Sequence, residues 1–161
     1  MSNPNDHDIR VLNGLIETTL DSADGFGEAA RDADHTGHRA LFEQRSFERR
    51  RLADALNQDV MAMGGRGPGE GSILHKAQRA FTDIKHALIT DEAAAVGAAE
   101  ANEDRLKARF EKALDDSDIS ATTRETIRRA YLEVAQGHGE ISALKHSLQG
   151  QKDAYNRLFP Q

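Results

Sequence analysis

The feature that most constrains this chain is the position of its three prolines. They stand at positions 4, 68 and 160, so nearly everything on either side of Pro68 is free of the residue that breaks helices most strongly. No Asn-Gly or Asp-Gly pair separates alternating apolar runs, as a β-hairpin would require, and Asp24-Gly25 lies inside a helical pattern. The sequence therefore predicts an all-α protein.

Apolar residues recur at heptad spacing in four long segments, which is typical of helix bundles. We expect the first helix over about residues 6–34 and the second over about residues 38–63, with a short turn around Gly37 that makes them antiparallel. A further long helix is expected over about residues 91–115, and Ser120, a favourable N-cap residue, opens the last one. The seam of the first helix contains Ile9, Leu12, Ile16, Thr19, Ala23, Phe26 and Ala30.

The long connection between the two expected hairpins differs in composition from the four helical segments. Residues 64–71, "GGRGPGEG", are too rich in glycine to be helical, and Ser72 then opens a shorter helix with an apolar inner face and a basic outer face. That helix is either a solvated surface element or an element that docks on a membrane surface or a partner. Two hairpins joined by one long crossover, about residues 64–90, form the topology of a ferritin-like bundle. We expect a single domain with flexible tails at about residues 1–6 and 150–161.

Four segments, taken in chain order, resemble a known family. "LNGLIETTLDSADGFGEAARD" (residues 12–32) resembles the first helix of an uncharacterised bacterial family in the ferritin-like superfamily, a domain of unknown function with a four-helix bundle. The other three resembling segments are "LFEQRSFERRRLADAL", "EANEDRLKARFEKAL" and "YLEVAQGHGEISAL". The resemblance implies a four-helix bundle fold and a homo-oligomer, with a dimer favoured. It implies no catalytic residues, because that family has no established activity.

Composition and charge exclude several classes of function. The formal net charge is −6, whereas a general nucleic-acid binder needs a clustered basic surface. There is no cysteine, which removes thiolate nucleophiles and cysteine-based metal sites. No segment approaches the roughly 20 apolar residues of a membrane-spanning helix, and the N-terminus lacks the apolar run of a signal peptide. We therefore expect a cytoplasmic protein without membrane insertion.

The ferritin-like resemblance raises the question of a di-iron site. Such sites use a Glu from each of two helices and a Glu-x-x-His motif from each of the other two. No Glu-x-x-His occurs in the chain, so a complete di-iron site is not encoded. The sequence still offers a reduced site. Glu48 and Glu103 flank the seams of their helices, and His138 lies on the seam of the last helix. These three residues are the candidate ligands for one iron, manganese or zinc ion, and no other cofactor is expected.

The neighbours of these residues favour a different interpretation. Arg45 and Arg49 share the second-helix seam with Glu48, and two guanidinium groups beside a carboxylate favour an ion-pair network and repel a cation. On this interpretation His138 is a neutral, hydrogen-bonded histidine in the core. Gly137 is then a place where a missing side chain lets another helix approach.

Two functional hypotheses follow. In the first, the protein is a non-enzymatic, stress-related bundle that acts by self-association or by binding a protein partner; polar seam residues such as Thr19, Arg45 and Arg109 would fix its register or oligomeric state. In the second, it is a metal-binding ferritin-like protein that works in stress or metal handling through Glu48, Glu103 and His138. Stoichiometric metal in the purified protein distinguishes the second hypothesis from the first.

Overall fold

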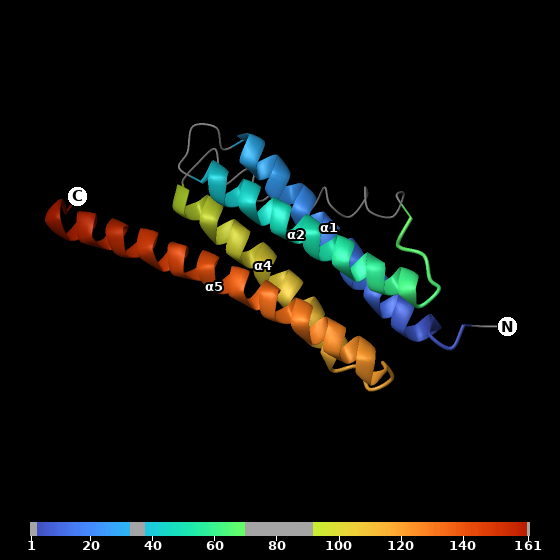
Figure 1. Cartoon of the computed structure of the whole chain (residues 1–161). Helices are drawn as coiled ribbons and strands as arrows, with labels where there is room; N and C mark the ends of the chain where they lie inside the picture. The colour runs from blue at the N-terminus through green and yellow to red at the C-terminus, as the bar shows by residue number, and fades with distance from the viewer. Residues whose placement is uncertain (1–2, 33–37, 70–91, 161) are drawn as a thin grey trace.

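The structure, a computed structural model, describes residues 3–32, 38–69 and 92–160. These residues form four α-helices, namely α1 (Asp6–Asp32), α2 (Arg39–Ala62), α4 (Glu92–Leu114) and α5 (Ala121–Leu158), as Figure 1 shows. The prediction of an all-α protein is confirmed. We expected a flexible tail after about residue 150, but α5 continues as a helix to Leu158. The shorter helix expected at about residues 72–90 lies outside the described residues.

The four helices pack as two antiparallel hairpins laid against each other. α1 lies along α2, and α4 lies along α5, and these two pairs pack most closely. Between the hairpins, α1 lies next to α4 and α2 lies next to α5. The result is a four-helix bundle, in which each helix buries one stripe against its neighbours. No helix in the described ranges combines the length and apolarity that a membrane crossing requires.

The described ends of the helices fix the course of the connection between the hairpins. α2 ends beside the start of α1, where the side-chain amide of Asn3 donates a 2.9 Å hydrogen bond to the carbonyl of Met63. α4 begins at the opposite end, where Val96 packs in one apolar cluster with Phe26 and Ile141. α2 therefore ends, and α4 begins, at opposite ends of the bundle.

Local sequence explains where two of these helices begin and end. Gly64, with a φ of 80°, follows α2 in the left-handed region that glycine adopts without strain. The amides of Gly64 and Gly65 then bond to the carbonyls of Met61 and Val60, which is the Schellman arrangement at a helix end. At the start of α5, the Ser120 side chain accepts a hydrogen bond from the amide of Thr123, so the predicted N-cap is confirmed.

The predicted seam of α1 lies in the core. In α1 the seam residues from Leu12 to Ala30 are buried, and Thr19 satisfies its hydroxyl within its own helix by donating to the Leu15 carbonyl at 2.7 Å. Two apolar clusters result. The larger one surrounds Leu56, Phe110 and Ile127 near the end where α5 begins, and the smaller one contains Phe26 at the other end. The interval between them is filled with charged side chains.

Candidate functional site

Two arginines of α2 occupy the interval between the apolar clusters. Arg45 and Arg49 are one helical turn apart, so both project from the same face of α2, and their relative exposures are only 2% and 0%. Opposite them stands Glu103 of α4, which is fully buried. We call the three residues Arg45, Arg49 and Glu103 the buried charge cluster.

Glu103 is held mainly by Arg49. The Nη2 and Nε atoms of Arg49 donate to Oε2 and Oε1 of Glu103 at 2.5 and 3.3 Å, which is the two-pronged geometry that guanidinium and carboxylate groups favour. The Nε atom of Arg45 lies 3.9 Å from Oε1 of the same carboxylate. The cluster therefore connects the first hairpin to the second through the centre of the bundle.

Arg45 has further partners toward the bundle surface. Its Nη1 lies 2.5 Å from Oε2 of Glu48, and its Nη2 lies 3.0 Å from Oε2 of Glu140 and donates to the carbonyl of Gly137 at 3.3 Å. The hydrogen bond from Arg45 is the main reason that the pKa of Glu140 lies below its usual value. A cavity of about 170 Å³ between α2 and α5 adjoins this outer end of the cluster.

Gly137 makes room for both guanidinium groups. A Cβ atom at this position would lie 2.5 Å from Nη1 of Arg45 and 2.7 Å from Nη2 of Arg49. Both distances are shorter than van der Waals contact, so a side chain here would displace the arginines from their partners. We expected this glycine to admit a neighbouring helix, whereas the structure shows that it admits arginine side chains. Gly139 has no neighbour within 4 Å of its Cβ position.

The three candidate metal ligands are not gathered at one point. Glu48 is paired with Arg45, the kind of ion pair that the sequence interpretation favoured, and Glu103 is paired with Arg49, which the sequence did not predict. His138 instead forms a hydrogen bond with Asp104 of α4, and its side chain is 22% exposed, so it is not the fully buried core histidine that we expected. The positive charge of Arg45 and Arg49 opposes a cation at Glu103.

One other group of potential ligands stands at the end of the bundle where α1 begins. Within the described ranges, the only set of three such side chains with ligand atoms inside 4.8 Å of one another is His7, Asp116 and Asp118. His7 Nε2 lies 2.9 Å from Asp116 Oδ2, and the Asp118 amide donates to Asp116 Oδ1 at 2.9 Å. That amide and, more weakly, His7 lower the pKa of Asp116. The set joins α1 to the turn between α4 and α5.

Asp8 strengthens the same junction. Its carboxylate accepts hydrogen bonds from the Ser120 hydroxyl at 2.6 Å and the Thr123 hydroxyl at 2.8 Å, and its exposure is only 6%. Burial acts to raise the pKa of Asp8, but these hydrogen bonds outweigh burial and the pKa lies below its usual value. The start of α1 is thereby fixed to the first turn of α5.

These features define a class of protein: a four-helix bundle in which charged residues at the centre link two hairpins. The chain belongs to the family described as a domain of unknown function (DUF2383), whose model matches residues 7–116. The matched part runs from α1 through α4 and contains the buried charge cluster, whereas α5 follows it. No curated protein matches the chain.

Proposed function

We propose that this protein is a non-enzymatic, ferritin-like helical bundle that acts by self-association, with a dimer as its favoured state. The ferritin-like assignment is supported by two antiparallel hairpins, with α1 beside α4 and α2 beside α5, and by α2 ending and α4 beginning at opposite ends of the bundle. This is the arrangement that one long crossover produces.

The observation that carries self-association is the exposed end of α5. Every residue from 149 to 160 is exposed, and Figure 1 shows the end of α5 extending past the start of α4. Tyr155, Leu158 and Phe159 are 59%, 74% and 58% exposed. They lie three and four positions apart, which places them on one helical face.

These three side chains form a coherent apolar surface. The rings of Tyr155 and Phe159 are in contact, with centroids 5.0 Å apart, and the exposed Leu158 directly precedes Phe159 in the chain. Scattered single apolar residues are normal on a protein surface, but a contiguous group that contains two aromatic rings is typical of an association surface. A second copy of the chain supplies an identical surface, so two copies can bury both groups at once in a symmetric contact.

The alternative function, metal binding by Glu48, Glu103 and His138, has less support from the geometry. Glu103 would have to leave Arg49 before it could bind a cation, and His138 is paired with Asp104. Each of these exchanges costs hydrogen bonds that are already made. We therefore place the metal-binding alternative second.

Sedimentation velocity at micromolar concentration tests the first proposal. The wild-type chain should sediment at twice its mass of 17.7 kDa. Replacing Tyr155, Leu158 and Phe159 together with serine should weaken the dimer at least about tenfold, because large apolar side chains dominate most interfaces. The matched control is Leu132→Ser, which removes another exposed leucine of α5 and should leave the dimer unchanged. A monomeric wild-type chain, or a triple variant as dimeric as the wild type, would contradict the proposal.

A further inference from the structure

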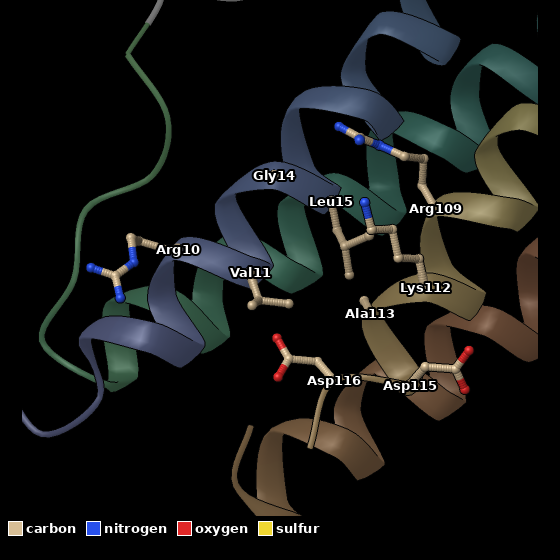
Figure 2. A pocket seen from close by; sticks show the side chains of 9 residues that line it. All are labelled: Arg10, Val11, Gly14, Leu15, Arg109, Lys112, Ala113, Asp115 and Asp116. Carbon is tan, nitrogen blue, oxygen red and sulfur yellow. The ribbon is translucent and has the colours of Figure 1, made fainter. Parts of the chain in front are cut away.

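A cavity of about 440 Å³ lies between α1 and α4, apart from the buried charge cluster and from the exposed end of α5. Its volume falls within the range of about 300–1,000 Å³ that is usual for small-molecule sites. Figure 2 shows the nine residues that line it, which are Arg10, Val11, Gly14, Leu15, Arg109, Lys112, Ala113, Asp115 and Asp116.

Small residues on both helices explain why the cavity exists. α1 and α4 pack less closely than the helices within each hairpin, and Gly14 of α1 and Ala113 of α4 offer little volume to fill the space between them. The Cβ position of Gly14 has nothing within 4 Å. Val11, Leu15 and Ala113 give the cavity an apolar floor, of which Leu15 and Ala113 are buried.

Arg109 and Lys112 differ from several arginines that the structure describes. Arg45, Arg50 and Arg51 each have a carboxylate within 4.0 Å. Arg109 and Lys112, by contrast, make no ion pair or side-chain hydrogen bond with any residue that the structure describes. In Figure 2 both side chains reach from α4 toward α1. Two cations without partners among the described residues therefore stand at one end of an apolar cavity, in a chain of net charge −6.

Asp116 stands at the other end of the cavity. The carboxylate of Asp116 lies on the side toward Val11 (Figure 2), where His7 holds it at 2.9 Å. Its pKa is lowered, so this group is ionised at neutral pH. Arg10 and Asp115 also line the cavity, but in Figure 2 both side chains point away from the apolar floor. An anion is therefore attracted by Arg109 and Lys112 and repelled by Asp116, which disfavours a second negative group at the Asp116 end.

From these features we propose that the cavity binds an amphiphilic monocarboxylate, a molecule with one carboxylate and an apolar chain. The carboxylate contacts Arg109 and Lys112, which are suited to it by charge and by the fork of N–H donors on arginine. The chain lies over Val11, Leu15 and Ala113 and leaves water, which supplies the hydrophobic part of the affinity. This assigns a role to Arg109, a charged residue at a position where the heptad pattern expects a core side chain.

Isothermal titration of the full chain with sodium decanoate, below its micelle concentration, tests the charge requirement. We expect saturable binding at one molecule per chain that weakens with added salt. Arg109→Ala should weaken binding about threefold and the Arg109→Ala/Lys112→Ala pair about tenfold, as expected for partly exposed ion pairs. The matched control is Arg105→Ala, an exposed arginine of α4 outside the cavity, which should bind as the wild type does. Decanedioate and decylamine should bind more weakly than decanoate.

A second pair of variants tests the position. Gly14→Leu places a side chain in the open space and should abolish decanoate binding, whereas Gly14→Ala should retain it. Leucine and alanine both have a higher helix propensity than glycine, so both variants should fold. Circular dichroism verifies this. Absence of saturable decanoate binding, equal binding of decylamine, or undiminished binding to Gly14→Leu would overturn the assignment. None of these results depends on whether the chain forms a dimer.

Discussion

Replacing Glu103 with glutamine should destabilise the protein severely, although the change keeps the volume of the side chain. Glu103 is completely buried, and in the described structure both side-chain hydrogen bonds of Arg49 go to it. Among the described residues, the variant removes the only full negative charge within hydrogen-bonding distance of the Arg49 guanidinium. An uncompensated charge then remains in the centre of the bundle.

The expected magnitude follows from the partners that remain. Breaking a buried ion pair by removing one member costs about 3–5 kcal/mol. Arg45 keeps Glu48 and Glu140, and the glutamine oxygen can still accept one hydrogen bond from Arg49, so we expect the lower end, about 3 kcal/mol. With a urea dependence of about 2 kcal/mol per molar, the unfolding midpoint should fall by about 1.5 M.

Urea unfolding followed by circular dichroism measures this difference. The control is Glu43→Gln, because Glu43 also pairs with an arginine but both side chains are more than half exposed; it should cost no more than about 0.5 kcal/mol. A second control replaces all three members of the buried charge cluster with apolar residues in one chain (Arg45→Met, Arg49→Met, Glu103→Leu), and this chain should be more stable than Glu103→Gln. Equal small shifts for Glu103→Gln and Glu43→Gln would refute the reasoning.

Three further outcomes are expected. Gly137→Ala should lower the unfolding midpoint because its Cβ meets two guanidinium groups, whereas Gly139→Ala, with open space around it, should raise stability by up to about 1 kcal/mol. The pKa of Asp8 in the folded protein is lowered from 3.8. Its carboxylate therefore stabilises the fold above pH 3.8, and this stabilisation is lost as the pH falls through the folded pKa. In Asp8→Asn, the free energy of unfolding should therefore fall less steeply as the pH is lowered through this range. Elemental analysis of protein purified without chelator should find no stoichiometric metal, and metal that is lost on His138→Ala would contradict us.

The course of the helices could be predicted because it depends on local pattern. Heptad spacing located the start of α1 at Asp6, and Ser120 marked the start of α5 through a hydrogen bond between near neighbours in the chain. The end of α5 was not predicted. After residue 148 the apolar pattern thins out, yet the helix continues to Leu158, where its three large apolar side chains are exposed and not buried in the bundle.

The site could be predicted only in part, because it depends on which residues from distant segments meet. Two arginines on one seam were enough to indicate an ion-pair network around Glu48. The sequence did not show that Glu103 is the main partner of Arg49, since that contact spans 54 positions. It also could not show that Gly137 faces the two guanidinium groups, or that His138 turns toward Asp104.

The surroundings of Arg109 were also not predicted from the sequence. Its seam position suggested a buried polar residue that fixes register, whereas its side chain is exposed at the edge of a cavity. Heptad position reports the direction in which a side chain leaves its helix, but the distance to the neighbouring helix depends on the residues opposite. Gly14 and Ala113 increase the free space there, and no periodicity within α4 contains that information.

The contact between Arg49 and Glu103 has a consequence for how chains assemble. It joins the α1–α2 hairpin to the α4–α5 hairpin, and it forbids a one-turn slide of about 5.4 Å because the slide would leave the guanidinium without its carboxylate. The contact does not require that both hairpins belong to one chain. Because α2 ends and α4 begins at opposite ends of the bundle, an exchange of hairpins between two molecules would form the same charge pairs in both halves. The centre of the bundle thus selects the alignment of hairpins while permitting domain exchange.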